Sequence, residues 1–175
     1  MRQGCHAADG LDSADVVILN SCTVTSAADR DLRQAVRRAR RANPAARILV
    51  TGCYAQRAPE ELAGLPGVTW VVGNSHKAQI PDLVLLATTP CHSRIHVGDV
   101  FAQQEFMAAP VEHAAGDRTR PNLKIQDGCN NRCTFCIIPS VRGPSRSAKP
   151  DDVVAQVRTL AASYREVVLS GVNLG

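Results

Sequence analysis

Short apolar runs alternate with amphipathic segments along the first half of the chain. Three runs bounded by turn residues have the length and continuity of strands buried on both faces of a parallel sheet: residues 15–20, 47–52 and 68–73. Apolar positions at helical spacing fall over residues 27–43 and 59–64, and a further helix is expected over residues 77–87, limited by Pro81. This alternation predicts an α/β fold with a parallel sheet as the N-terminal domain, residues 1–87.

The pattern changes after this domain. Residues 88–119 are poor in apolar positions and contain His and Pro, which predicts a linker with only a weak strand in IHVGDVF. A second domain is expected over residues 120–175. Its elements are a strand at 122–127, a cysteine-rich loop, a helix at 151–163 and a strand at 166–171, which together make one β-loop-α-β unit. One such unit cannot bury both faces of its sheet, so we expect the sequence to be part of a longer protein.

Composition indicates a folded protein with few aromatic residues in its cores. Hydrophobic residues make up 45% of the chain but aromatic residues only 3%, so Ala, Val, Leu and Ile must fill the interior. The start of the chain is polar and no apolar run approaches the roughly 18 residues of a membrane span, so a cytoplasmic location is expected. In a reducing compartment, seven cysteines favour ligands, catalytic groups or core residues over disulfides.

Positive charge is concentrated in the helical segment 27–43. The segment carries six arginines against two aspartates, an excess equal to the formal net charge of +4 of the whole chain. The segment is either an ordinary solvated helix face or a surface that contacts phosphates. On the second interpretation, the candidate RNA-binding residues are Arg37, Arg38, Arg40 and Arg41.

Three cysteines stand close together in DGCNNRCTFC, residues 127–136. They are Cys129, Cys133 and Cys136, separated by three and then two residues, and no cysteine follows them. A structural zinc site needs four ligands and would have to recruit Cys91, His92 or His113. Three thiolates on a four-iron cluster instead leave one iron open to a substrate-like ligand, as a catalytic cluster requires. We therefore expect a catalytic iron–sulfur cluster, and a zinc site stays open as the alternative.

This cysteine spacing, with Phe135 before the last thiol and a strand before the loop, resembles the radical S-adenosylmethionine enzymes. The resemblance implies that the open iron binds S-adenosylmethionine and that the reduced cluster splits it. It also implies that GVNLG, residues 171–175, lies beside the methionine part of the cofactor. Phe135, Gly171 and Asn173 are then candidate cofactor contacts, and the second domain is the start of a partial TIM barrel.

Two further cysteines narrow the resemblance. Cys22 follows the first predicted strand in NSCTVT, and Cys53 follows the second in GCYAQ. Neighbouring parallel strands end at the same sheet edge, so the two thiols can share a ligand, although either alone could be a buried core residue. These two motifs, together with VVGN, Lys77 and KIQDGCNNRCTFCIIPSVRG, resemble the methylthiotransferases across nearly the whole chain.

The methylthiotransferase resemblance implies a second four-iron cluster, held by three cysteines of the N-terminal domain. Cys22 and Cys53 would supply two of them. The family's third cysteine follows an earlier strand, and no such strand precedes residue 15. Cys5 is not assigned the role, because the family has an ordinary residue at that place. We therefore expect neither a stable auxiliary cluster nor turnover from this chain alone.

The activity implied by the resemblance is methylthiolation of tRNA. GCYAQ, KIQDGC and GVNLG look most like the branch that adds a methylthio group to C2 of N6-threonylcarbamoyladenosine at tRNA position 37. The implied partners are tRNA and an electron-donor protein. Other branches modify an isopentenyladenosine in tRNA or an aspartate of a ribosomal protein. A different class also remains open, a non-catalytic iron–sulfur or zinc module that binds RNA through the arginine-rich helix.

Overall fold

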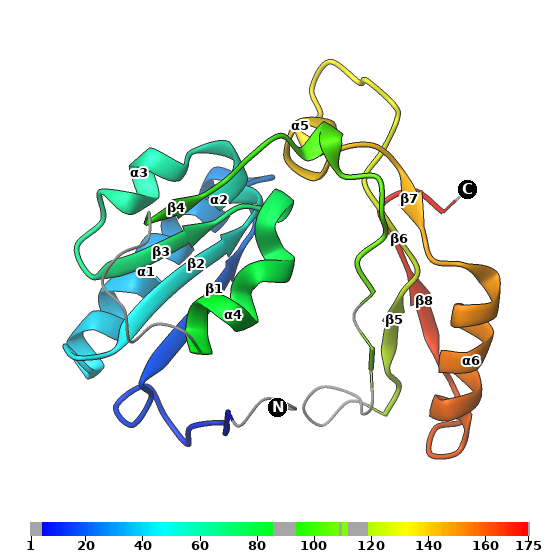
Figure 1. Ribbon diagram of the computed structural model, residues 1–175, viewed down its shortest axis with the longest axis horizontal. Helices are drawn as coiled ribbons and strands as arrows, with labels where there is room; N and C mark the ends of the chain where they lie inside the picture. Colours follow the sequence, from blue (N-terminus) through cyan, green and yellow to red (C-terminus); the bar gives the residue numbers. More distant parts are fainter. Residues whose placement is uncertain (1–4, 86–93, 109, 112–118, 175) are drawn as a thin grey trace. The chain divides into compact units, whose positions relative to one another are not determined.

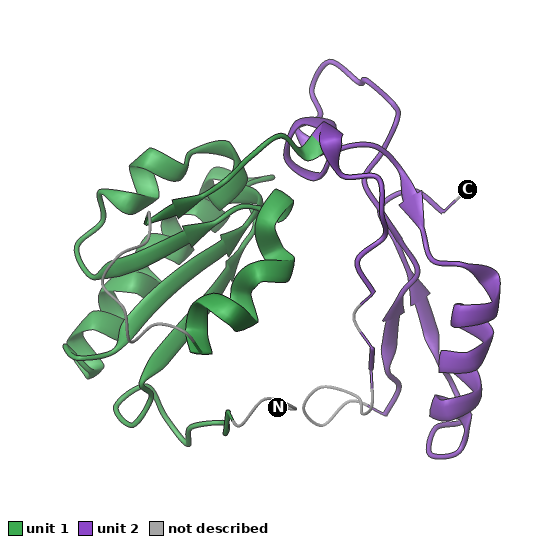
Figure 2. Ribbon diagram, viewed as in Figure 1, with its two compact units in different colours: residues 1–100 green, residues 101–175 purple. Residues whose placement is uncertain are grey.

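The computed structural model describes residues 5–85, 94–108, 110–111 and 119–174. The chain divides into two compact units, residues 1–100 and residues 101–175 (Figure 2). Helices alternate with parallel strands in both units, so the predicted α/β class is confirmed. The finer division at residues 87 and 119 stays a prediction.

A parallel sheet forms the centre of unit 1 (Figure 1). Its described strands, in spatial order, are β1 (Val16–Ser21), β2 (Arg47–Gly52), β3 (Val68–Val72) and β4 (Ile95–His96). β2 is a central strand, and its residues Ile48, Leu49 and Val50 are fully buried, which explains its continuous apolar sequence. β4 lies within the segment predicted as a linker and pairs with β3.

Helices cover both faces of this sheet. They are α1 (Ser26–Ala42), α2 (Cys53–Arg57), α3 (Pro59–Ala63), the 3₁₀ helix η1 (Asn74–Gln79) and α4 (Ile80–Leu85). Leu32, Val36 and Ala39 of α1 pack in the larger core cluster, whereas α4 packs its partly buried residues against Leu49 and Trp70 on the opposite face. The layers are therefore helix, sheet, helix.

The ends of α1 follow from its sequence. The Thr25 side chain accepts a hydrogen bond from the Ala28 N–H at 3.2 Å and caps the N-terminus. Asp29 lies in the first turn, while Arg40 and Arg41 lie in the last turn, so the charges complement the helix dipole.

The helical structure predicted over residues 77–87 is observed as far as residue 85, divided into two short elements. A 3₁₀ helix occupies residues 74–79, and α4 begins at Ile80, with residues 86 and 87 outside the described part. Pro81 stands in the first turn of α4. The missing N–H of a proline costs nothing there, so Pro81 starts this helix rather than interrupting it.

Unit 2 contains the predicted β-loop-α-β unit. β5 (Asn122–Lys124) pairs in parallel with β8 (Val168–Ser170), and α6 (Pro150–Ala161) connects them on the chain. The remaining elements are η2 (Val100–Ala102), which begins at the last residue of unit 1, β6 (Gln126–Asp127), α5 (Ile138–Arg142) and β7 (Arg146–Ser147). α5 and β7 were not predicted.

The expected strand 122–127 is split at Ile125. The Ile125 N–H donates to the Ser170 carbonyl at 2.9 Å, whereas its carbonyl accepts from the Ala148 N–H at 2.8 Å. The backbone thereby changes partner from β8 to the antiparallel strand β7. The cysteine loop begins directly after this change of partner, at the end of β6.

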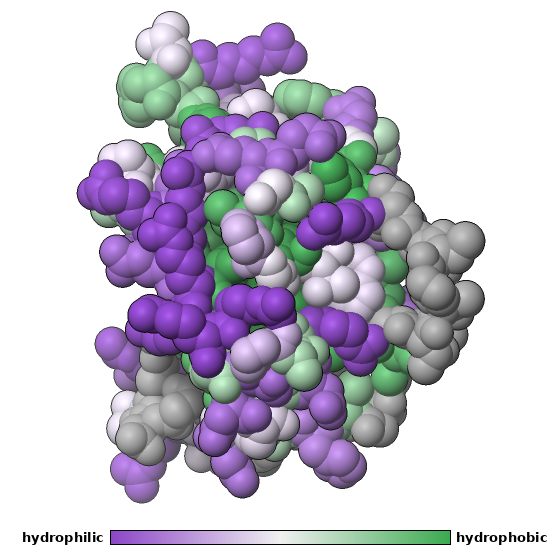
Figure 3. All heavy atoms as spheres, turned by 90° about the vertical axis from the view of Figure 1, so that its left-hand side faces the viewer, coloured by the Kyte–Doolittle hydropathy of each residue, from purple (hydrophilic) through white to green (hydrophobic). Residues whose placement is uncertain are grey.

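The face of unit 1 that carries α1 and α3 is mainly hydrophilic, with hydrophobic side chains between the polar ones (Figure 3). In the part of the chain that the structure describes, no helix combines the length and apolarity that a bilayer span requires.

Gly52 is the position in unit 1 where we expect a small substitution to be most disruptive. Its φ is 102°, and an added Cβ would overlap the Ser21 carbonyl oxygen of β1. Gly52→Ala should lower the free energy of unfolding by about 1–3 kcal/mol, measured by urea denaturation. Gly64→Ala is the control, because Gly64 has a helical φ of −74° and an added Cβ would find its nearest neighbours at 3.5 Å. Equal stability of the two variants would contradict the prediction.

Candidate functional site

Backbone contacts close the cysteine loop of unit 2 at its neck. Gly128 has a φ of 73° and lies so close to Pro144 that an added Cβ would overlap the Pro144 carbonyl oxygen. The Cys129 N–H donates to the Gly143 carbonyl oxygen at 3.1 Å. The two ends of the loop are thus held together, and the three cysteines project from one closed segment.

All three cysteines of this loop are free thiols. Cys133 is exposed, and Cys129 and Cys136 are half-buried. The Cys136 N–H donates to the Cys133 carbonyl oxygen at 3.0 Å, which forms a turn between the last two cysteines. Phe135, on this turn, is 91% exposed.

Three free thiols on one accessible loop suit an iron–sulfur cluster in their chemistry. Their side chains do not converge, however: no group of three or more His, Cys, Asp or Glu among the described residues is placed to hold a metal ion. The structure thus brings the cysteines onto one loop without gathering their sulfurs. The assignment of Cys129, Cys133 and Cys136 as ligands stays a prediction.

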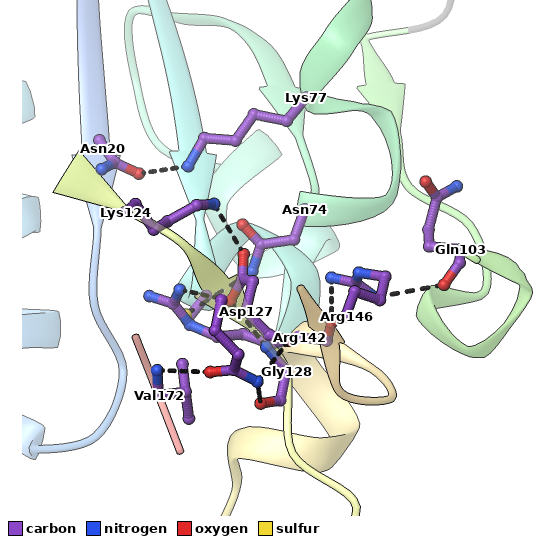
Figure 4. A network of polar contacts seen from close by, with 12 residues as sticks. Asn20, Asn74, Lys77, Gln103, Lys124, Asp127, Gly128, Arg142, Arg146 and Val172 are labelled. Atoms are coloured by element: carbon purple, nitrogen blue, oxygen red, sulfur yellow. Dashed lines mark hydrogen bonds and ion pairs between the residues drawn. The ribbon is translucent and has the colours of Figure 1, made fainter. Parts of the chain in front are cut away.

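Asp127 anchors the start of the loop through its carboxylate. Its Oδ1 accepts from Arg142 Nη1 at 2.9 Å and from the Gly128 N–H at 2.9 Å, and its Oδ2 accepts from Lys124 Nζ at 3.0 Å (Figure 4). Burial raises the pKa of Asp127, but the hydrogen bonds from Arg142 and Lys124 outweigh it. The pKa therefore lies below the ordinary aspartate value, and the carboxylate stays charged at neutral pH.

The residues predicted to lie beside the cofactor contact Gln126. The Val172 and Asn173 N–H groups donate to Gln126 Oε1 at 2.8 and 2.9 Å. An added Cβ on Gly171 would lie 2.8 Å from the Gln126 Cβ, so only glycine fits there without a shift. The motif KIQDGC supported the family resemblance, but the sequence assigned no role to Gln126 or Asp127 within it. A polar pair between a buried strand and a Gly-Cys turn was the available signal.

The second pair of candidate cysteines lies at the edge of the unit 1 sheet where the strands end. Ser21, the last residue of β1, pairs with Gly52, the last residue of β2, so Cys22 and Cys53 each follow a paired position. Cys53 is 2% exposed and Cys22 is exposed. The predicted placement after neighbouring strands is therefore observed, while the role as cluster ligands stays a prediction.

Polar side chains surround this edge of unit 1. Asn74 Nδ2 donates to Cys53 Sγ at 3.6 Å. Lys77 Nζ donates to Asn20 Oδ1 at 3.0 Å (Figure 4). The Val24 N–H donates to Cys22 Sγ at 3.5 Å. Such donors stabilise thiolates, so the chemistry of the edge suits thiolate ligands.

The arginines of α1 divide into two groups. Arg33 contacts the Tyr54 hydroxyl and Glu61, and Arg40 donates to the Pro44 carbonyl, so these two have structural partners. The other group is exposed, and no polar partner is found for its members among the described residues: Arg30, Arg37, Arg38 and Arg41. Their charges are thus available to solvent or to a ligand.

The remaining candidate ligands are Cys5 and the residues of the zinc alternative. Cys5 is a free, exposed cysteine and received no ligand role. The zinc alternative needed Cys91, His92 or His113, and all three lie outside the described residues.

Comparisons with known proteins match both the N-terminal and the C-terminal part of the chain to family models. Residues 1–73 match the family described as "Uncharacterized protein family UPF0004", and residues 123–173 match the "Radical SAM superfamily". Threonylcarbamoyladenosine tRNA methylthiotransferase MtaB of Aquifex aeolicus is 42% identical over 99% of this chain and 42% of its own length. The chain thus joins a UPF0004 segment to a Radical SAM segment, and nearly its whole length is similar to proteins named as tRNA methylthiotransferases.

The relatives of this chain carry two kinds of name. The protein named MtaB in Bacillus subtilis is 42% identical over 98% of this chain and 38% of its own length. The tRNA-2-methylthio-N(6)-dimethylallyladenosine synthase of Mycobacterium avium is 36% identical over 97% of this chain and 24% of its own length. The chain thus spans about two fifths of the length of the first two relatives. Superfamily membership implies a four-iron, four-sulfur cluster and S-adenosylmethionine.

The lowered pKa of Asp127 gives a test of this anchor. A lowered native pKa means that the stabilisation is complete above the unfolded-state pKa of about 3.9 and is lost as the pH falls through the native pKa. Asp127→Asn should cost about 1–2 kcal/mol of unfolding free energy near neutral pH, since both cationic partners are partly exposed. The difference from wild type should shrink when urea denaturation is repeated below the native pKa.

Glu105→Gln is the control for this test. Glu105 is an exposed acid of the same unit, so its substitution makes a similar change from acid to amide without removing the anchor. A difference between Asp127→Asn and wild type that is independent of pH would contradict the ion-pair explanation.

Proposed function

We propose that the protein containing this chain adds a methylthio group to C2 of N6-threonylcarbamoyladenosine at tRNA position 37. The observation that carries the proposal is the 42% identity, over 99% of the chain, to a relative named as a threonylcarbamoyladenosine tRNA methylthiotransferase. The closed three-cysteine loop behind β6 supports it, because it offers three thiols and no regular structure between them. The protein would be a radical S-adenosylmethionine enzyme, acting in the cytoplasm on tRNA.

In this proposal the cysteine loop of unit 2 holds the catalytic cluster. Cys129, Cys133 and Cys136 would be its ligands, and the bound cluster would supply the electron that splits S-adenosylmethionine. The chain's own part is to hold and orient. Gly171 and Asn173 would lie beside the cofactor, and the exposed ring of Phe135 would cover part of it.

A second cluster in unit 1 belongs to the proposal for the whole protein. Cys22 and Cys53 stand at one sheet edge and would be two of its three ligands. The hydrogen bond from Asn74 to Cys53 Sγ supports a thiolate at that position. An electron-donor protein is the further partner that a reducible cluster requires.

A second candidate substrate is a dimethylallyladenosine-type base in tRNA. It is supported by the 36% identity to the synthase of that name, which is lower than the identity to the first two relatives. Mass spectrometry of tRNA nucleosides distinguishes the two. Expression of the full-length protein in a host whose tRNA carries both candidate nucleosides without a methylthio group should produce the methylthio form of N6-threonylcarbamoyladenosine. Appearance of only the methylthiolated dimethylallyl nucleoside would favour the second candidate, and appearance of neither would contradict both.

The catalytic cluster can be tested by counting iron. Replacing Cys129, Cys133 or Cys136 by Ala should each lower bound iron and sulfide by about four per chain after anaerobic reconstitution. Cys5→Ala is the matched control, because Cys5 is another free cysteine of the described chain and received no ligand role. A variant of the loop that keeps its full iron would remove the assignment. Zinc in place of iron in the wild-type protein would favour the non-catalytic module.

Phosphate contact by α1 can be tested through the salt dependence of tRNA binding. Arg37 and Arg38 are exposed and have no polar partner among the described residues, so their charges can reach phosphates. Arg37→Gln with Arg38→Gln should weaken binding and reduce the slope of log affinity against log salt by about 1–2. Arg158→Gln with Arg165→Gln, two exposed arginines of unit 2, should change the slope less. Equal slopes for the two double variants would leave α1 as a solvated face.

A further inference from the structure

Gln126 is a buried amide whose hydrogen bonds reach three separate segments of the chain. The residue lies in β6 and is 3% exposed. Its Nε2 donates to the carbonyl oxygens of Asp127 and Gly128, at 2.9 and 2.8 Å, and to Ser145 Oγ at 3.0 Å. Its Oε1 accepts from two N–H groups of the turn after β8.

The Nε2 atom of this amide therefore bonds to the cysteine loop. Gly128 is the residue before Cys129 and forms the neck of the loop, and Ser145 stands at the other end of that neck. The Ser145 N–H in turn donates to Asn130 Oδ1 at 2.9 Å. Donation from Nε2 thus fixes both ends of the loop at the same atom.

The Oε1 atom of the amide bonds to the turn 171–174. The Oε1 atom accepts from the N–H groups of Val172 and Asn173, so the turn is fixed by its backbone rather than by its side chains (Figure 4). An added Cβ on Gly171 would also lie 3.0 Å from Oε1, which holds the turn tightly against the glutamine. A primary amide is suited to this place, because it donates and accepts at the same time.

We propose that Gln126 is a positioning residue that sets the turn 171–174 against the cysteine loop and thereby determines the affinity for S-adenosylmethionine. The inference rests on the proposed function, in which the cluster sits on the loop and the cofactor lies against the turn. Gln126 touches neither group in this account. It acts through backbone atoms of Gly128, Val172 and Asn173, so its loss should loosen the cofactor site and leave the cluster in place.

Two variants separate the two sides of the amide. Gln126→Met has similar length and removes every hydrogen bond of the side chain. Gln126→Glu keeps an acceptor for the Val172 and Asn173 N–H groups but, when ionised, cannot donate to the loop. Gln104→Met is the matched control, because Gln104 is an exposed glutamine of the same unit. Among the described residues its side chain makes one long hydrogen bond, 3.4 Å to the Phe101 carbonyl.

The experiment uses the anaerobically reconstituted protein. Iron content is measured first, then the dissociation constant of S-adenosylmethionine and the change that the cofactor causes in the electron paramagnetic resonance spectrum of the reduced cluster. Gln126→Met should keep its iron, bind the cofactor about 10–100-fold more weakly and lose protection of the Val172 and Asn173 amides in hydrogen exchange. Gln126→Glu should keep that protection and still bind the cofactor more weakly, while Gln104→Met should behave as wild type.

Three results would overturn the inference in distinguishable ways. A wild-type protein that holds the cluster but does not bind S-adenosylmethionine would overturn the proposed function, and this inference with it. Wild-type binding that Gln126→Met leaves unchanged would overturn the inference alone. Loss of iron from both Gln126 variants would also overturn it, because Gln126 would then serve cluster assembly rather than cofactor positioning.

Discussion

Both candidate sites depend on a glycine that turns the backbone at the end of a strand. Gly52 is the last residue of β2 and precedes Cys53, and Gly128 follows β6 and precedes Cys129, with φ values of 102° and 73°. An added Cβ at either position would overlap a carbonyl oxygen of a neighbouring segment. Only a residue without a side chain permits this approach, so each cysteine is placed by the glycine before it. A Gly-Cys dipeptide thus allows the close backbone approach before the cysteine in both units.

A glutamine near each of these turns connects segments that are distant in sequence. Gln126 joins the cysteine loop to the turn after β8. In unit 1, Gln56 accepts from the Ser75 N–H at 3.1 Å and donates to the Gly98 carbonyl at 2.8 Å. Loops at the ends of parallel strands leave backbone donors and acceptors without strand partners, and a neutral amide can satisfy one of each. The polar groups at these edges are therefore part of the scaffold that holds the candidate sites.

Charge is used differently in the two units. In unit 2, Lys124 and Arg142 converge on Asp127, so their charge stabilises the base of the loop. In unit 1, α1 buries Val36 and Ala39 and exposes Arg37, Arg38 and Arg41. Their charge contributes little to the fold, because exposed arginines without partners gain little from folding. This difference is why a phosphate ligand is proposed for α1 and not for the base of the loop.

The sequence alone determined the elements whose pattern is local. Parallel strands buried on both faces leave continuous apolar runs, and β1, β2 and β3 were predicted to within a residue or two at each end. α1 was equally clear, since apolar positions recur at helical spacing over residues 27–43, and the Thr25 cap was found only in the structure. The cysteine spacing and the other motifs also depend on sequence alone, and the comparisons bear out the resemblance drawn from them.

Tertiary structure decided what depends on partners far along the chain. The split of the strand 122–127 at Ile125 arises because its N–H and its carbonyl bond to different strands, and no local pattern encodes that choice. β7 contains two residues, too few for a hydrophobic period to reveal it, and β4 of the same length was indicated only as a weak strand. The role of Gln126 needs the β8 turn to fold back onto β6 from 46 positions away, and the lowered pKa of Asp127 needs Arg142 from 15 positions away. Hydrogen bonds and ion pairs of this kind exist only once the chain has brought both partners together, so the sequence could name the cysteines but not the groups that hold their loop.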